Sequence, residues 1–203
     1  MGRLIKFPVP EYAPEKFGLQ RVSSKRSDAA PAPKAGQLNL FAGARTVRMQ
    51  TLTHFEEALL LDDQGTDLKA AKLHYQKAIN DGEFIADAYC NLGILEWKEG
   101  RTAKAIDCFT QSLKFEPRHF EAHYNLANLY AEVGNLPLAK VHYEISIELE
   151  PTFPNSHFNL GLTLAMNKEF KEAMTVLQRY KELTPNEDHK HTDDLLEKLK
   201  LAN

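Results

Sequence analysis

The chain has little cysteine and no long hydrophobic run. Its 203 residues include only two cysteines, Cys90 and Cys108, which excludes a disulfide framework and a four-cysteine zinc site. No stretch approaches the roughly 18 apolar residues of a membrane-spanning helix, so we expect no membrane partner. The stretch 35–44 lies well inside the chain and contains polar residues and glycines, so we do not interpret it as a signal peptide. We expect a soluble protein in the reducing cytoplasm.

Motifs of catalytic sites are also missing. The chain contains no Gly-rich phosphate loop, no nucleophile elbow and no His-Glu-x-x-His motif. Of the eight histidines, four recur with the repeat described below, and the two that flank Lys190 have no third ligand beside them. We therefore expect no catalytic residues, no metal site and no cofactor, and we expect that the protein is not an enzyme.

Charge is distributed unevenly along the chain. Residues 1–50 carry nine Lys or Arg and only three Asp or Glu, although the net charge of the whole chain is −3. The same segment contains five prolines before residue 37 and the low-complexity stretch Ala-Ala-Pro-Ala-Pro at 29–33. Such a composition does not bury enough apolar surface to fold, which predicts a disordered basic arm over residues 1–50. Within it, the apolar segment 38–41 is a candidate to dock onto the first folded unit.

A spacing of 34 residues organises the remainder of the chain, 51–203. Small alanines recur at this spacing, each followed four residues later by a bulky side chain: Ala71 with Tyr75, Ala105 with Phe109, Ala139 with Tyr143 and Ala173 with Leu177. The same spacing relates further residues, namely Asn91, Asn125 and Asn159, the turn glycines Gly100 and Gly134, and the prolines Pro117, Pro151 and Pro185. Glycine closes a first helix through a left-handed turn, and proline stops a second one, so each unit is a helix hairpin.

Four such units are predicted, at about 52–85, 86–119, 120–153 and 154–187, followed by a capping helix at about 192–201 with Thr192 as its N-cap. The first and fourth units depart from the pattern. Gly65 comes one residue early and Glu83 replaces the proline, so the first helix, at about 53–61, is expected to be shortened or shifted. In the fourth unit Lys168 stands where the turn glycine is expected.

The pattern resembles the tetratricopeptide repeat family. The second unit carries the resemblance most fully, through Tyr89, Leu92, Gly93, Ala105, Phe109 and Pro117. The resemblance implies an all-α, right-handed superhelical solenoid whose first helices line a concave groove for partner proteins. It thus implies a protein or peptide ligand.

A second apolar stripe runs along the first helices, beside the residues used by the repeat. It comprises Cys90, Ile94 and Trp97 in unit two, Tyr124 and Asn128 in unit three, and Phe158 and Leu162 in unit four. Under the family geometry these residues face the groove, while the alternative is that they pack as ordinary core. Asn91, Asn125 and Asn159 are candidates to bind a peptide backbone, with hydrogen bonds to the neighbouring repeat as the alternative.

The charge of the predicted groove constrains its ligand. Among the groove positions only Lys98 is basic, whereas Asp87 and Glu121 are acidic. Some family members clamp the C-terminal carboxylates of chaperones with lysines and arginines, and we do not expect such a clamp here. A ligand with apolar anchors and neutral or basic flanks fits better.

Three classes of function follow from the sequence. The first is a protein-interaction scaffold without catalytic activity. The second is a transcriptional regulator or nucleic-acid-associated protein that uses the basic arm, although no helix-turn-helix pattern fits residues 1–36 and we do not expect nucleic acid as the partner. The third is an adaptor subunit that recruits an enzyme.

Overall fold

The computed structural model describes residues 52–65 and 67–202, so the predicted arm and the segment 38–41 lie outside the described residues. Over the described part the chain forms nine α-helices and no strand. They are α2 (His54–Gln64), α3 (Leu68–Asp81), α4 (Ile85–Lys98), α5 (Thr102–Phe115), α6 (Phe120–Glu132), α7 (Leu136–Leu149), α8 (Pro154–Met166), α9 (Phe170–Leu183) and α10 (Lys190–Ala202). No helix in these residues has the length and apolar character needed to cross a bilayer.

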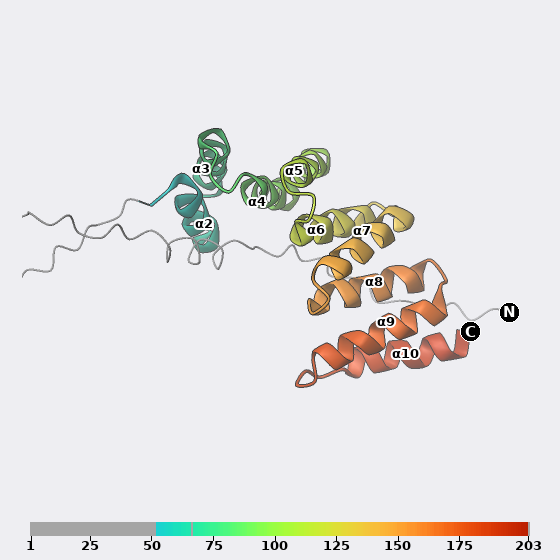
Figure 1. Ribbon diagram of the computed structural model, residues 1–203. Helices are drawn as coiled ribbons and strands as arrows, with labels where there is room; N and C mark the ends of the chain where they lie inside the picture. Colours follow the sequence, from blue (N-terminus) through green and yellow to red (C-terminus); the bar gives the residue numbers. More distant parts are fainter. Residues whose placement is uncertain (1–51, 66, 203) are drawn as a thin grey trace, which may run out of the picture.

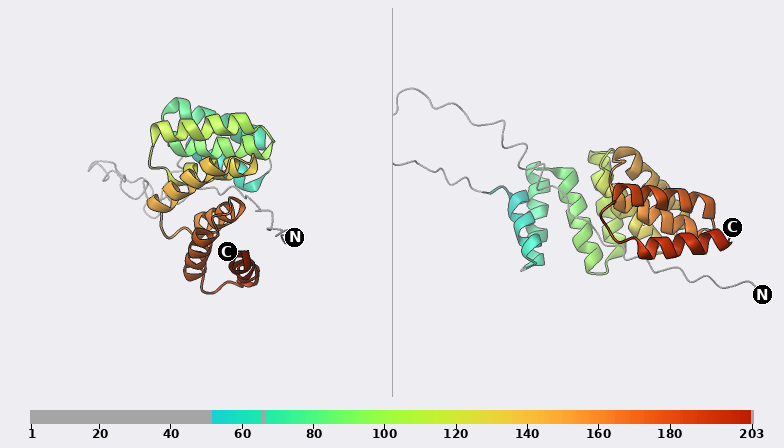
Figure 2. Two further views of the ribbon diagram at one scale, coloured as in Figure 1. Left: turned by 90° about the vertical axis from the view of Figure 1, so that its right-hand side faces the viewer. Right: turned by 90° about the horizontal axis from the view of Figure 1, so that it is seen from below.

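The helices pack as four consecutive pairs, α2 with α3, α4 with α5, α6 with α7 and α8 with α9, and α10 packs on α9. Each pair also contacts the next, because α3 packs on α4, α5 on α6 and α7 on α8. The pairs therefore stack in chain order, and the stack turns as it proceeds, which places α10 at the opposite end from α2 (Figures 1 and 2). The expected all-α solenoid of four helix pairs with a C-terminal helix is confirmed.

The residues that define the repeat form its core. The four alanines Ala71, Ala105, Ala139 and Ala173 are completely buried, as are their bulky partners Tyr75, Phe109, Tyr143 and Leu177. Neither helix of a pair could bury its apolar face alone, so the hydrophobic clusters extend from each pair into the next.

The turns between the helices of a pair depend on a left-handed residue. Gly100 and Gly134 have φ values of 73° and 80°, a conformation that glycine adopts without steric cost. Lys168, at the equivalent place in the fourth pair, adopts φ 66° in spite of its Cβ atom. The turn geometry of the fold is therefore retained even where the sequence lacks the glycine.

The two ends of the array differ from the sequence-based expectation. Helix α2 ends at Gln64, three residues beyond the expected end, and is closed by Gly65 at φ 62°. With 11 residues it is nevertheless shorter than α4, α6 and α8, which have 13 or 14, so the expected shortening is confirmed. Thr53 caps its start in a capping box with Glu56. At the other end α10 begins at Lys190, so the expectation that Thr192 is the N-cap is wrong: its side chain is buried in the first turn.

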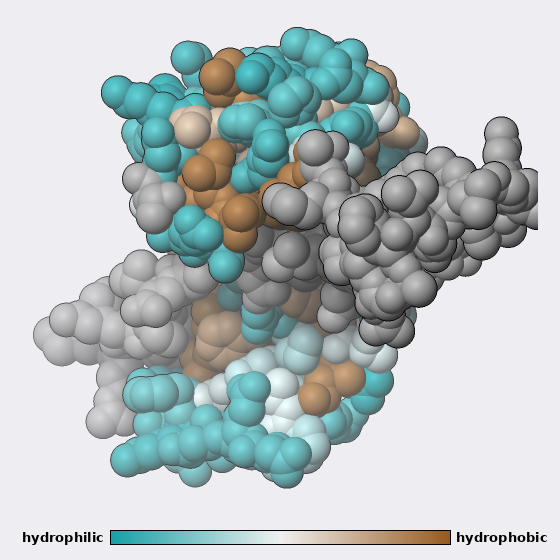
Figure 3. Space-filling view, turned by 90° about the vertical axis from the view of Figure 1, so that its left-hand side faces the viewer, coloured by the Kyte–Doolittle hydropathy of each residue, from teal (hydrophilic) through white to brown (hydrophobic). Residues whose placement is uncertain are grey.

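The first helices of successive pairs lie on the inside of the bend. Helix α4 contacts α6, and α6 contacts α8, in addition to the contacts that each makes with its own partner. Like helices approach one another only on the inner side of a curved array. Hydrophobic side chains are visible between the upper and lower parts of the molecule (Figure 3).

Candidate functional site

The predicted groove residues lie in the first helices α4, α6 and α8, and most of them are buried. Ile94 and Cys90 pack in the cluster that joins α4 to α5 and α6, and Leu162 packs in the cluster of the third and fourth pairs. Tyr124 is also buried, with its ring edge-on to Phe153 at a centroid distance of 5.1 Å. These side chains contribute to the packing between units.

Trp97 and Phe158 retain partial exposure. The indole Nε1 of Trp97 donates a hydrogen bond to Glu132 Oε2 at 2.6 Å, which connects the end of α4 to the end of α6. The ring of Phe158 lies 5.0 Å from that of Tyr180 in α9. Of the three aromatic residues in the predicted stripe, Trp97 and Phe158 therefore offer more surface to a ligand than Tyr124 does.

The three predicted asparagines are buried in first helices, at the same repeat position. The amide nitrogen of Asn159 donates to Asn128 Oδ1 at 3.0 Å and to the Tyr124 hydroxyl at 3.2 Å, both in α6. The amide nitrogen of Asn125 lies 3.8 Å from the sulfur of Cys90 in α4. Both side chains thus bond to side chains of the preceding unit.

Two carboxylates meet around a buried histidine where α4 and α6 approach each other. His119, the N-cap of α6, has its Nε2 3.4 Å from Asp87 Oδ1 and its Nδ1 3.0 Å from Glu121 Oε2. Burial by itself lowers the pKa of His119, but the interactions with the two carboxylates outweigh it and raise the pKa to about 9.

This cluster was only partly visible in the sequence. Asp87 and Glu121 stand out as the acidic groove positions, but nothing indicated that His119 would lie between them. When neutral, its Nδ1 accepts a hydrogen bond from the backbone nitrogen of Ala122 at 3.2 Å, as expected of an N-cap. The signal in the sequence was the polar His119 directly before the apolar start of a helix, a pattern that is typical of an N-cap.

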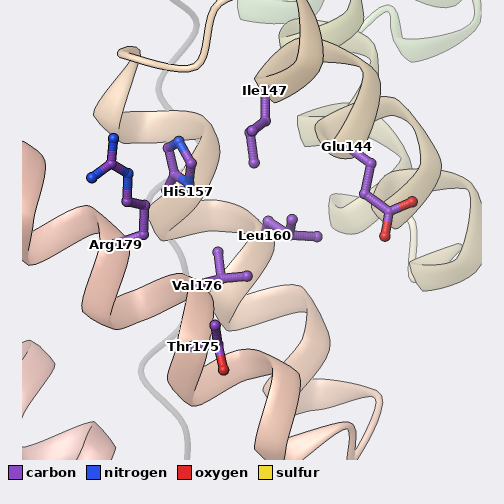
Figure 4. A pocket seen from close by; sticks show the side chains of 7 residues that line it. All are labelled: Glu144, Ile147, His157, Leu160, Thr175, Val176 and Arg179. Atoms are coloured by element: carbon purple, nitrogen blue, oxygen red, sulfur yellow. The ribbon is translucent and has the colours of Figure 1, made fainter.

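A hollow of about 390 Å³ is lined by α7 of unit three and by α8 and α9 of unit four (Figure 4). Ile147, Leu160 and Val176 form its apolar floor, and Glu144 and Arg179 stand on opposite sides of it. His157 lines it as well and contacts the Pro151 carbonyl oxygen through Nε2 at 2.9 Å. Burial lowers the pKa of His157 below its usual value.

Comparison with known proteins identifies the repeat. One model of the tetratricopeptide repeat matches residues 86–119, and a second matches residues 108–140 and 142–175. Hsp70-Hsp90 organizing protein 2 of Arabidopsis thaliana is 31% identical over 90 residues, which are 44% of this chain and 16% of that protein. The chain thus spans less than a fifth of the length of this relative.

Solved structures show the same fold. The first repeat domain of Spaghetti (RPAP3), bound to the HSP90 peptide SRMEEVD, superposes with a TM-score of 0.54 and 22% identity over 58% of this chain and 91% of that one. The crystal structure of MamA superposes with a TM-score of 0.60 and 15% identity over 73% of this chain and 85% of that one. At these identities the likeness concerns the architecture of stacked helix pairs.

Proposed function

Because this chain belongs to the tetratricopeptide repeat family, we propose that it is a non-catalytic scaffold that binds a partner protein on the inner face of its solenoid. The observation that carries the proposal is the combination of acidic and aromatic side chains on helices that approach one another. Asp87 lies in α4, Glu121 in α6 and Phe158 in α8. A row of this kind is suited to an extended segment that runs from one unit to the next.

The charge of this face supports a particular chemistry of partner. Asp87 and Glu121 place two carboxylates against one histidine, which supports an acidic character for this face. The related domain of Spaghetti (RPAP3) was solved with the acidic peptide SRMEEVD, which this face would repel. The proposed ligand therefore places an apolar side chain near Phe158 and Trp97, and it carries a Lys or Arg that is attracted at a distance by the buried carboxylates of Asp87 and Glu121.

In this proposal the buried residues of the predicted groove do not contact the ligand but support the residues that do. Tyr124 and the three asparagines fix the angle between units, and Cys90, Ile94, Asn128 and Leu162 form the wall behind the anchors. Both cysteines are free thiols, which supports a location in the reducing cytoplasm.

Peptide binding to the full chain tests the charge preference. Fluorescence anisotropy would compare a labelled peptide that has an apolar core and Lys/Arg flanks with SRMEEVD. We expect tighter binding of the basic peptide, and Glu121→Gln should weaken it about tenfold, which corresponds to roughly 1.4 kcal/mol. The control is Glu148→Gln, a change to an exposed residue of the outer helix α7, which should leave the affinity unchanged. A preference for SRMEEVD would contradict the proposed charge.

Partner capture tests the aromatic anchor. Proteins retained by the native chain, by Phe158→Ala and by Phe115→Ala would be identified by mass spectrometry after the melting temperatures have been compared. Phe115 is an exposed phenylalanine of the outer helix α5. Phe115→Ala therefore removes the same kind of side chain as Phe158→Ala, but away from the inner face. We expect partners to be lost from Phe158→Ala alone, and identical lists for all three proteins would refute binding on the inner face.

A further inference from the structure

Two histidines and a glutamate meet at the first helix pair, away from the acidic cluster described above. His54 and Glu57 lie in the first turns of α2, and His74 lies in the middle of α3. The Nδ1 atom of His54 is 3.3 Å from His74 Nδ1 and 3.3 Å from Glu57 Oε2, and His74 Nδ1 is 2.8 Å from the same carboxylate oxygen. Three potential ligand atoms thus converge from two helices.

These separations match a tetrahedral metal centre. Bonds of about 2.0–2.1 Å from Zn²⁺ to imidazole nitrogen or carboxylate oxygen place neighbouring ligand atoms of a tetrahedron about 3.3 Å apart. Two of the three observed distances have this value, and the third requires a small outward rotation of one side chain. With both imidazoles neutral at Nδ1 and the carboxylate ionised, each of the three atoms presents a lone pair to the same point.

We propose that His54, Glu57 and His74 form a binding site for a divalent transition metal, with Zn²⁺ as the best match to the nitrogen and oxygen ligands. The three side chains are 37%, 37% and 22% exposed, so an ion reaches them from solvent and keeps water as its fourth ligand. Asp81 Oδ2 lies 3.8 Å from Nε2 of His54. From there it favours the tautomer of His54 that keeps the proton on Nε2 and leaves Nδ1 for the metal.

The third unit contains a natural control for this site. His123 and His142 repeat the arrangement, with Nδ1 atoms 2.9 Å apart and ring centroids 5.2 Å apart, compared with 5.4 Å for His54 and His74. The residue three positions after His123 is Leu126, however, where the first unit has Glu57. A pair of histidines without the carboxylate offers only two ligands.

Binding at this site would connect the two helices of the first unit. The ligands come from the start of α2 and the middle of α3, so one ion holds the terminal helix of the described array against its partner. A ligand that binds only the folded state stabilises it by mass action. A bound ion should therefore stabilise the end of the solenoid that contains α2.

The test is a titration of the full chain, stripped with chelator, with ZnCl₂ in a calorimeter. We expect one saturable site per chain, affinity reduced at least tenfold in Glu57→Gln and in His74→Gln, and unchanged affinity in His142→Gln. Co²⁺ titrated into the native chain should develop the intense visible absorption of tetrahedral coordination. Thermal unfolding of every variant without metal checks that it is folded.

Each contrary result overturns the proposal. No saturable binding to the folded native chain would exclude the site, and equal affinity of His74→Gln and native chain would place the ion elsewhere. Loss of binding in the double variant His189→Gln/His191→Gln would assign it to the start of α10. Weak, pale Co²⁺ spectra would contradict the tetrahedral geometry.

Discussion

A Cβ atom placed on Gly93 would lie 2.8 Å from Cε1 of Phe109, closer than carbon atoms approach in proteins. Helix α4 therefore packs on α5 with only a hydrogen atom between backbone and ring. Gly161 has the same relationship to Leu177, at 2.6 Å, whereas the third unit holds Ala127 at the equivalent position. The spacing between helices of a pair is thus adjusted separately in each unit.

Gly93→Ala should lower the stability of the protein. Overpacking a close contact costs about 1–3 kcal/mol, and the better helix propensity of alanine returns up to about 1 kcal/mol. We expect a net loss of about 1 kcal/mol in urea unfolding. In a Phe109→Ala background the same substitution should cost less, because the side chain that the new Cβ atom meets is gone; an equal cost in both backgrounds would show that Phe109 is not the obstacle.

Lys168→Gly should raise stability by about 1 kcal/mol, because it removes a Cβ atom from a left-handed backbone conformation. The extra freedom that glycine gives the unfolded chain limits the gain. The reciprocal change, Gly134→Ala at φ 80°, should lower stability by a similar amount. Thermal melting of both variants checks the pair, and equal shifts in the same direction would contradict this explanation.

The 34-residue spacing was sufficient to predict the helix pairs because it reflects contacts that every unit must make. Ala105 and Phe109 occupy the same place in unit two as Ala139 and Tyr143 in unit three, and all four are completely buried. The ends of the array obey weaker constraints. Helix α10 begins before Thr192 because packing on α9 buries the threonine, and tertiary contact overrides its preference for the N-cap.

The sites were harder to predict, since they depend on departures from the repeat. His54 has no counterpart at the 34-residue spacing because Gly65 comes one residue early; when the turn glycines are aligned, His54 corresponds to His123. This shift hid the pair that His54 forms with His74. Tyr124 and Phe158 also occupy one repeat position, yet they have different neighbours. Tyr124 is buried against Phe153 and Asn159, whereas Phe158 is half-buried beside Tyr180.

His119 should make stability depend on pH. Its pKa of about 9 in the folded protein exceeds the value of about 6.5 for an unfolded chain, so its protonation stabilises the fold. This contribution is fully present below pH ~6.5 and is lost as pH rises through 9. His119→Asn keeps an N-cap residue but never becomes charged. Between pH 6 and 9.5 its free energy of unfolding should therefore fall less than that of the native chain, by a difference on the order of 2 kcal/mol.

Urea midpoints measured at pH 6, 7.5 and 9.5 check this difference. His191→Asn, a change at an exposed histidine, is the control and should show the pH dependence of the native chain. If His119→Asn also followed the native curve, the two carboxylates would not hold the proton on His119.

Substitution of Asn159 distinguishes a role in packing between units from a role in ligand binding. The amide nitrogen of Asn159 donates hydrogen bonds to Asn128 Oδ1 and to the Tyr124 hydroxyl, inside the contact between α8 and α6. Asn159→Ala removes both bonds. Asn128 Oδ1 still accepts a hydrogen bond from the Tyr143 hydroxyl, so the cost is that of the two lost bonds. Because one intramolecular hydrogen bond contributes about 0.5–1.5 kcal/mol, we expect a loss of about 1–3 kcal/mol without any ligand. Asn80→Ala is the control, since it makes the same change at an exposed position of α3 and gains the same helix propensity. Equal stability of the two variants in urea unfolding would mean that the Asn159 side chain does not hold the units together, and its role would then be sought in the bound complex.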